Sequence, residues 1–361
     1  MTDSHIHHDG VTHHPLGAGS SIFKKNLIEH ITQYCTKPCT ILHIGAQPNS
    51  SPHVGTLVNF SVAFALAKRI REDVSASPRN VLVSLDLVDT APSQQLSLDG
   101  IKYQRSHRYT REMENHMGDF RHVMESLHSY SGVPYRIRTQ EEFLSHPDMP
   151  DIVQDIVQRR TDLAKSLAPE RGCLAIRATC PRVNCGLSEK YGTRNVYNDE
   201  KKTITFYCPS HGEYTVDIQT ASGVSRLEFS TPMRNILRAA AFERDKEATW
   251  IHVPGADYAG YYQEQLLWRH IHQPYLIFYS PLILDWSGAK LSKSLYKKNA
   301  YKYLVDQQLE YLVSFEKFKE QGKYLRVLYD EVTDWVENPF KLFRSYSVEY
   351  MNSLFQVPQK G

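Results

Sequence analysis

The sequence predicts an α/β fold in which a doubly wound parallel sheet carries a small inserted ribbon and ends in a short helical region. A β-branched run at 40–45 passes through a loop rich in Pro, Asn and Ser into an apolar helix that begins at Val54. Further strand-like runs at 81–89, at 134–139 and around Trp250 alternate with helical stretches, as expected of parallel strands. Two Cys-Pro segments lie between the last two runs and predict the insertion.

The bulk composition limits what the chain can be. Its 361 residues provide 41% apolar side chains, enough for a large core, and the net charge is only +2. Nucleic-acid binding would therefore depend on local basic patches. No run approaches the ~18 apolar residues of a membrane helix, and no signal-peptide core is visible, so we expect no membrane partner and a cytoplasmic location. Residues 1–20 contain five histidines and are predicted to be a disordered tail.

The first loop predicts a phosphate site. A strand that leads through a loop into a helix gathers free backbone N–H groups and the positive end of a helix dipole at one place. His53 stands at this helix mouth, and Gly55 behind it lets a ligand approach the backbone. His43 lies inside the strand, where a core histidine is the expected role.

Three motifs resemble those of the class I aminoacyl-tRNA synthetases. The stretch at 48–56, PNSSPHVGT, resembles their Pro-rich loop and His-x-Gly-His signature, with Thr56 in place of the second histidine as in glutamyl-type members. The stretch at 289–294, AKLSKS, is similar to their Lys-Met-Ser-Lys-Ser loop, with Leu for Met. Gly255 and Asp257 form a Gly-x-Asp motif after the strand at Trp250.

This resemblance implies a Rossmann-like catalytic domain with ATP as a possible cofactor. Its implied catalytic residues are His53, Lys290 and Lys293, because two lysines at i and i+3 can clamp the phosphates of ATP. An ordinary solvated basic loop is the alternative for the lysines. The implied nucleotide-binding residues are Gly45, His53, Gly55, Thr56, Gly255, Asp257, Lys290, Ser292 and Lys293.

Several acids are candidates for binding an amino-acid substrate. Asp86 and Asp89 end the second predicted strand, where they could select a cationic side chain or act as caps. Glu228 and Tyr258 are further candidates, and a surface role is the alternative for Glu228. The stretch at 100–130 is basic and aromatic; helical spacing would place its cations on one face, which suits an RNA backbone or a solvated surface.

The predicted insertion has the sequence pattern of a zinc ribbon. Each half has a Cys-Pro start and a Gly after its second candidate ligand, and strands are predicted at 203–207 and 214–218. Three thiolates and one imidazole make a closed tetrahedral site, so the zinc would be structural; a disulfide is the weaker alternative. The predicted ligands are Cys180, Cys185, Cys208 and His211. The predicted free thiols are Cys35, Cys39 and Cys173.

The order of these features most resembles the catalytic core of the class I lysyl-tRNA synthetases, over about residues 38–300. A helix with an N-cap at Thr231 and Pro232 at its first helical position follows the ribbon. The predicted organisation is a tail at 1–20, the first half of the catalytic domain at 21–172, the ribbon at 173–222, the second half with the lysine loop at 223–300 and a helical region at 301–361.

The short C-terminal region narrows the predicted function. A lysyl-type synthetase has a larger helical domain there for reading the anticodon, so we expect no anticodon readout. A core without that module resembles the fungal arginine-containing cyclodipeptide synthases, which join arginine to a second residue from aminoacyl-tRNAs as a diketopiperazine in secondary metabolism. Their Asp-Asp-x-x-Glu motif has no literal copy here. Bacterial cyclodipeptide synthases use a serine on the first loop, where Ser50 and Ser51 are possible nucleophiles.

Two alternatives stay open. In one, the chain forms an aminoacyl-adenylate of a basic amino acid with ATP, and the two lysines stabilise the departing pyrophosphate. In the other, it is an inactive paralogue that binds tRNA. The expected partners are the acceptor ends of aminoacyl-tRNAs and small-molecule amino acids.

Overall fold

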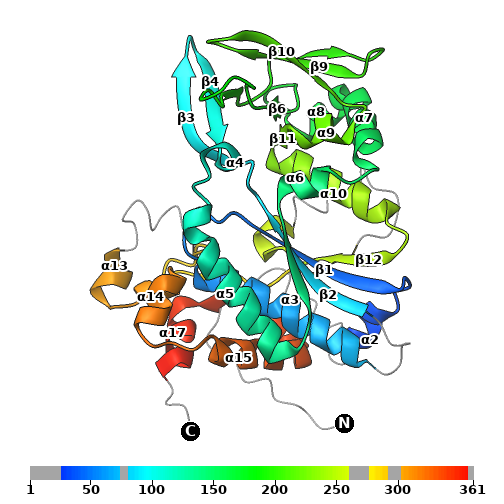
Figure 1. Cartoon of the computed structure of the whole chain (residues 1–361). Coiled ribbons are helices and arrows are strands. Elements are labelled where there is room, and N and C mark those ends of the chain that lie inside the picture. Colours follow the sequence, from blue (N-terminus) through cyan, green and yellow to red (C-terminus); the bar gives the residue numbers. More distant parts are fainter. Residues whose placement is uncertain (1–25, 74–79, 260–275, 292–301, 357–361) are drawn as a thin grey trace.

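A five-stranded parallel sheet forms the centre of the fold in the computed structural model, which describes residues 26–73, 80–259, 276–291 and 302–356 (Figure 1). All neighbouring strands run parallel. The order across the sheet is β13 (Leu276–Ile277), β12 (Ala248–His252), β1 (Cys39–Ala46), β2 (Asn80–Leu87) and β5 (Tyr135–Arg138). The chain thus builds outward from β1 in both directions, which confirms the predicted doubly wound α/β class.

The central strands form where the sequence is apolar and β-branched. In β1, residues 40–44 are all buried, and every residue of β12 is buried. Such runs without alternation are typical of parallel strands covered on both faces. The predicted strands at 40–45, 81–89 and 134–139 each lie within three residues of an observed boundary.

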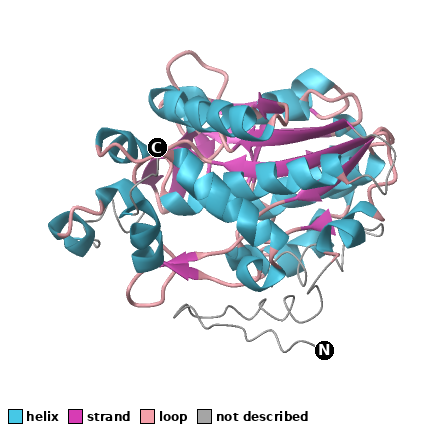
Figure 2. Ribbon diagram, turned by 90° about the horizontal axis from the view of Figure 1, so that it is seen from below, coloured by secondary structure: helices cyan, strands magenta, loops and turns pink. Residues whose placement is uncertain are grey.

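Helices cover the sheet, as Figure 2 shows from below. α3 (Val54–Glu72) packs between the sheet and α15 (Leu325–Glu337), and α5 (Glu114–Ser131) lies beside it. Phe60 and Phe64 of α3 are fully buried. α3 is therefore apolar around most of its surface, as expected of a helix with packing on two sides.

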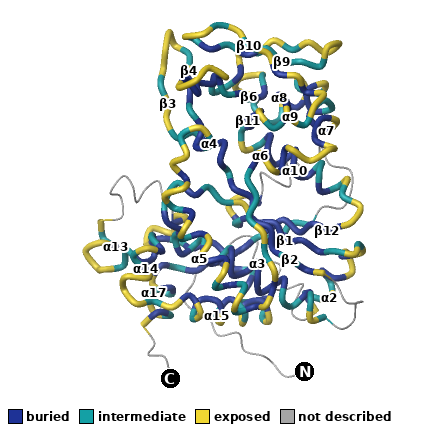
Figure 3. Tube along the Cα trace, in the orientation of Figure 1, coloured by how far each residue is buried: buried dark blue, intermediate teal, exposed yellow. Residues whose placement is uncertain are grey.

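The C-terminal helices belong to this same core (Figure 3). Trp335 of α15 is fully buried and stacks on Tyr346, with ring centroids 4.0 Å apart. The short N-terminal helix α2 (Leu27–Thr32) also packs against α3. The remaining elements here are α13 (Lys302–Asp306), η4 (Glu310–Leu312), α14 (Phe315–Glu320), α16 (Pro339–Leu342), β14 (Ile283–Leu284), β15 (Tyr346–Ser347) and α17 (Val348–Gln356).

A second lobe lies beyond the carboxyl ends of β1 and β2 (Figure 1). The predicted ribbon strands are present, and their apolar faces share a core with the helices on either side of the ribbon in sequence. Its strands are β3 (Pro92–Leu98), β4 (Ile101–Ser106), β6 (Ile176–Ala178), β7 (Ser188–Glu189), β8 (Val196–Asn198), β9 (Thr203–Cys208), β10 (Gly212–Asp217) and β11 (Leu227–Phe229). Its helices are α4 (His107–Thr110), α6 (Gln140–Leu144), α7 (Met149–Gln158), α8 (Arg160–Leu167), α9 (Ala221–Ser225) and α10 (Thr231–Arg244).

The predicted helical face at 100–130 is wrong in its first part. Asp99 and Gly100 both have positive φ angles, 49° and 77°, and form the tight turn of the β3–β4 hairpin. Lys102 and Arg105 therefore lie on a strand, and helix α5 begins only at Glu114. The basic residues do not share one helical face.

Smaller differences concern other boundaries. Within residues 151–167 the chain is divided at Arg159 into α7 and α8. The N-cap of α10 is Ser230, with Thr231 as the first helical residue and Pro232 in the first turn. The predicted tail at 1–20 falls outside the described residues. Across the described ranges, no helix has the length and apolarity needed to cross a membrane.

A buried polar network crosses the carboxyl half of the sheet. The carboxylate of Asp86 on β2 accepts two hydrogen bonds from Arg138, at 3.0 and 2.9 Å, and lies 3.4 Å from Nε of Arg238 on α10. His43 Nε2 lies 3.1 Å from the same carboxylate, and His43 Nδ1 lies 2.6 Å from His252 Nδ1. Burial alone would raise the pKa of Asp86, but these cations and His43 hold it below its usual range. His43 thus lies in the core, as predicted.

This network predicts a loss of stability in acid. Burial lowers the pKa of His43 from 6.5 to about 4, so the unfolded chain binds the proton more readily than the native chain. The free energy of unfolding should therefore fall by about 3 kcal/mol as the pH is lowered through this window. Asp86, whose pKa is depressed, adds a loss at still lower pH. Urea denaturation at several pH values measures both.

The matched variants separate this histidine from the others. His43→Gln should reduce the pH dependence between 6.5 and 4, leaving the part due to His252, whose pKa burial also lowers, whereas the exposed His146→Gln should leave it as in the parent protein. An unchanged pH slope in His43→Gln would show that His43 titrates alike in the folded and unfolded chains.

Candidate functional site

A cavity of about 570 Å³ opens at the carboxyl ends of β1 and β12, where the strand order reverses. Ligands of doubly wound folds bind at this place, and the volume suits a nucleotide-sized molecule. The structure brings together eight of the predicted site residues around this cavity: Gly45, His53, Gly55, Thr56, Gly255, Asp257, Tyr258 and Lys290. Ser292 and Lys293 lie outside the described residues.

His53 is the N-cap of α3. Its backbone is extended, and its Nδ1 accepts a hydrogen bond of 3.0 Å from the backbone N–H of Gly55. Because Nδ1 is an acceptor, the neutral ring carries its proton on Nε2. A Cβ atom on Gly55 would lie 2.8 Å from Cε1 of His53, so the absence of a side chain there lets the imidazole cap the helix.

The facing wall comes from the Gly-x-Asp turn and the lysine loop. The Lys290 ammonium forms an ion pair with the Asp257 carboxylate and lies 6.0 Å from the centroid of the Tyr258 ring. A Cβ atom on Gly255 would meet Asp257 Oδ1 at 2.5 Å, which explains the glycine. Asp285 organises the turn before Lys290 by accepting hydrogen bonds from the Ser287 and Ala289 backbones. The Asp-Trp-Ser-Gly sequence could have indicated that turn.

Asn59 is a residue of this site that the sequence interpretation missed. Its Nδ2 donates to the carbonyl of Val253, at 3.0 Å, and to the Oγ of Ser280, at 2.9 Å. These bonds tie α3 to the ends of β12 and β13 across the point where the strand order reverses. A single amide side chain in the mostly apolar first three turns of the helix was the available signal.

The predicted substrate acids are all buried, and their environments differ. The carboxylate of Asp86 is 1% exposed and paired with cations of the protein, so the predicted direct contact with a substrate is not supported. Asp89 lies 3.4 Å from Arg108, and Glu228 lies 3.9 Å from Arg177. Burial raises the pKa of both carboxyl groups against the effect of these arginines. Neither acid borders the cavity at the ends of β1 and β12.

The serines of the first loop turn away from the cavity. The Oγ of Ser51 donates to Asp119 on α5, at 2.6 Å, and accepts from the backbone N–H of Glu316 on α14, at 3.0 Å. Ser51 thus joins the loop to two helices, and its predicted role as nucleophile is not supported because its hydroxyl is engaged there. Ser50 does not line the cavity either.

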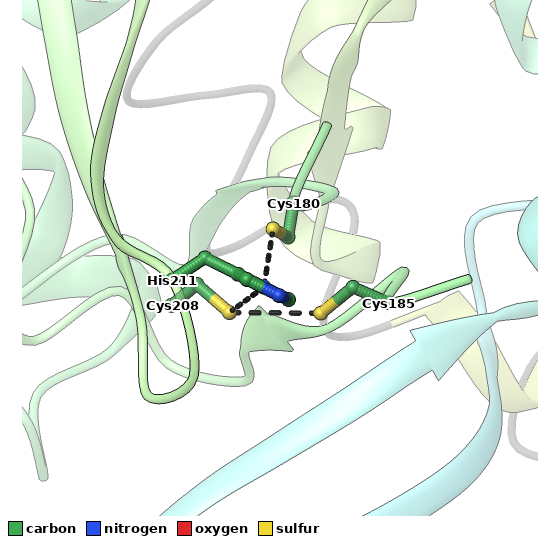
Figure 4. Close-up of side chains that lie close together, drawn as sticks. All are labelled: Cys180, Cys185, Cys208 and His211. Atoms are coloured by element: carbon green, nitrogen blue, oxygen red, sulfur yellow. Dashed lines mark hydrogen bonds between the residues drawn. The ribbon is translucent and has the colours of Figure 1, made fainter. Parts of the chain in front are cut away.

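The four predicted metal ligands meet at the base of the ribbon (Figure 4). The ligand atoms of Cys180, Cys185, Cys208 and His211 all lie within 4.8 Å of one another. The Cys185 and Cys208 sulfurs are 3.6 Å apart, and all six cysteines are free, which argues against the disulfide alternative. Three soft thiol ligands and an imidazole that can converge in this way fit a tetrahedral metal ion.

The fold and this cavity define the chain as a doubly wound α/β protein with a ligand site of nucleotide size. No family model and no curated protein matches its sequence. Among solved structures, it is similar to a glutamate tRNA ligase from Elizabethkingia meningosepticum (14% identity, 72% of this chain and 53% of that chain, TM-score 0.33). It is also similar to a glutamate-tRNA synthetase from Elizabethkingia anophelis (14%, 72% and 54%, 0.32).

A third similar structure is the tryptophanyl-tRNA synthetase of Plasmodium falciparum (13% identity, 89% of this chain and 87% of that chain, TM-score 0.35). The chain spans about half the length of the two glutamate enzymes. Likeness at this level does not establish a shared activity, so the function has to be inferred from this chain's own residues.

The cysteine cluster predicts a bound metal ion that depends on all four ligands. The purified protein should contain about one transition-metal ion per chain by mass spectrometry of the elements, and Cys208→Ser should lose most of it. Cys39→Ser changes a thiol outside the cluster and should keep the metal. Full metal content in Cys208→Ser would disprove the four-ligand assignment.

The close approach of the His53 ring to Gly55 predicts that a side chain at position 55 destabilises the start of α3. Gly55→Ala should displace the His53 ring from its capping position and lower the free energy of unfolding by about 1 kcal/mol. Gly118→Ala in α5 meets no neighbour within 4 Å and should raise it by about 0.5–1 kcal/mol. Equal effects of the two substitutions in thermal and urea denaturation would contradict the proposed packing.

Proposed function

We propose that this chain is an aminoacyl-tRNA-dependent enzyme that joins arginine and a second amino acid into a cyclic dipeptide. The observation that carries the proposal is one cavity with His53 at the mouth of α3 on one wall and Asp257 and Lys290 on the other. Such a cavity can hold the terminal adenosine of a charged tRNA with its ester next to hydrogen-bond donors.

The reaction needs positioning and charge stabilisation more than a cofactor. The α-amino group of one aminoacyl-tRNA attacks the ester carbonyl of the other, forms a peptide bond and releases one tRNA hydroxyl. The amino group of the dipeptide then attacks the remaining ester, which closes the diketopiperazine and releases the second tRNA. To the Nε2–H of His53 and the cation of Lys290, which both line the cavity, we assign the stabilisation of the developing negative charge.

Two buried acids, Asp89 and Glu228, which do not border the cavity at the ends of β1 and β12, are the residues to which we assign recognition of the arginine side chain. Asp89 Oδ1 and Glu228 Oε2 are both buried without a hydrogen-bond partner among the described residues. The two carboxylates influence each other electrostatically, and a guanidinium group could satisfy both. Arg108 and Arg177 offset part of the charge of the two acids. The planar guanidinium of arginine can bind two carboxylates at once, which the ammonium of lysine does less well.

We further assign zinc to the cysteine cluster. Its thiol-rich ligand set is closed and lies away from the cavity at the ends of β1 and β12, so the ion would hold the ribbon in shape and take no part in the reaction. Six free cysteines agree with a reducing compartment such as the cytosol. The described C-terminal helices are built into the sheet core, so that part of the chain offers no separate module for an anticodon.

A second candidate function is ATP-dependent activation of a basic amino acid. The position of Lys290 opposite the helix mouth favours it, because this pair could hold the phosphates of ATP. In that reaction the amino-acid carboxylate attacks the α-phosphate, and pyrophosphate leaves.

The two functions are separated by their substrates. Arginyl-tRNA plus a second charged tRNA, without ATP, should yield an arginine-containing cyclic dipeptide, detected by mass spectrometry and abolished by prior ribonuclease treatment. Robust exchange of pyrophosphate into ATP with free arginine, and no cyclic product, would instead establish the second candidate.

The cavity assignment is tested by side-chain removal. His53→Ala and Lys290→Ala should each lower kcat/KM for the cyclic product about 10²-fold, because each removes a donor to developing charge. The exposed His146→Ala and Lys302→Ala serve as matched controls and should keep the parent rate. Parent-like rates in both cavity variants would show that the chemistry occurs elsewhere.

A further inference from the structure

A second cavity of about 320 Å³ lies beside the nucleotide-sized one, between β4, β6 and the start of α10. Gln47, the residue that follows β1, lines both cavities. The two cavities therefore adjoin at this residue.

The second cavity is lined by cations and by no acid. Among the described residues that border it are Arg171, Arg177, Lys190 and Arg234, and none is Asp or Glu. Arg177 meets one acid, Glu228, which lies 3.9 Å away and does not border the cavity. Burial raises the pKa of Glu228, so it is a weak counter-charge. The cavity thus carries a net positive charge that attracts an anion.

One buried donor at its base is unsatisfied. Gln104 is 1% exposed, and its Nε2 has no hydrogen-bond partner in the described part of the chain. Arg177, which is 5% exposed, keeps its Nε toward Glu228 and donates from Nη1 to the carbonyl of Lys190 at 3.2 Å. Buried donors without partners are costly, which makes them pointers to a missing acceptor.

The start of α10 adds a third feature. This helix has 14 residues, and its N-cap Ser230 makes no side-chain hydrogen bond to the first turn. The positive end of its dipole and its first amides therefore lie at the wall of the cavity. The buried amide of Gln104, the surrounding cations and this helix end all favour the same kind of ligand, an anion with several acceptor oxygens.

We propose that the second cavity binds a backbone phosphate of an RNA 3′ end whose terminal nucleoside occupies the first cavity. The proposal rests on the proposed function. Gln104 and Arg177 line the inner part of this cavity. Lys190 and the exposed Arg171 line its opening, and the Arg171 guanidinium stacks 4.0 Å from the Tyr191 ring centroid. A phosphodiester has the acceptor oxygens for such donors on two sides. Pyrophosphate offers the same chemistry from a different source.

The test measures RNA binding without any reaction. A 5′-labelled RNA hairpin with a single-stranded CCA end is titrated against the full chain and against Lys190→Gln and Gln104→Leu. Each variant should weaken binding about 5- to 10-fold, and Lys190→Gln should reduce the slope of log K against log salt by about 0.7–1. Arg182→Gln, an exposed change on the same lobe outside the cavity, should bind as the parent does.

Three controls keep the result decisive. A hairpin that lacks its last three nucleotides should bind the parent and variants alike. Thermal denaturation checks that each variant is folded. If Gln104→Leu does not fold, Lys190→Gln, a change at a half-buried position, still tests the proposal. Because the RNA carries no amino acid, the binding result stands even if no cyclic dipeptide forms.

Three results would overturn the proposal. The first is RNA binding by both variants with the parent's affinity and salt slope. The second is an equal loss with the truncated hairpin, which would place the contact elsewhere on the RNA. The third is loss of inorganic pyrophosphate binding while RNA binding is unchanged, which would assign the cavity to a small leaving group.

Discussion

The buried carboxylate of Asp86 is the constraint on which the rest of the structure depends. An ion without exposure to water must be compensated by nearby charges and hydrogen bonds, and Arg138, Arg238 and His43 provide them. These partners come from β5, from α10 and from β1, so one charge joins neighbouring strands to the second lobe. The cavity at the ends of β1 and β12 opens against the same edge of the sheet. Removing any one partner would leave charge uncompensated where the two lobes meet.

Much of the first cavity could be predicted from the sequence because its determinants are local. The run from β1 through the Pro-rich loop to His53 specifies a strand, a loop and a capped helix by nearest-neighbour preferences alone. The cysteine cluster was predictable for the same reason, since each half is a short turn that brings two ligands together. Gly255 and Asp257 could be placed because they directly follow a buried strand.

The remaining features depend on contacts between distant residues, which spacing does not encode. Nothing near Asp86 in the sequence shows that Arg238, more than 150 residues away, will neutralise it. The sequence around Ser51 does not show that Asp119 and the backbone of Glu316 form hydrogen bonds with its hydroxyl. The β3–β4 hairpin is different, because its Asp99-Gly100 turn is a strong local signal that was outweighed by the density of basic residues.

The second cavity and the metal ligands are connected through strand β4. Its Gln104 borders the second cavity, while the next residue, Arg105, donates from Nε to the carbonyl of Cys185 at 2.7 Å. β4 also pairs with β7, which follows the ligands Cys180 and Cys185 in the chain. A metal ion held by these four ligands would fix the position of Cys185 and hence of β4, because a tetrahedral ligand set tolerates little displacement. The ribbon would in this way also set the position of Gln104 beside the positively charged cavity.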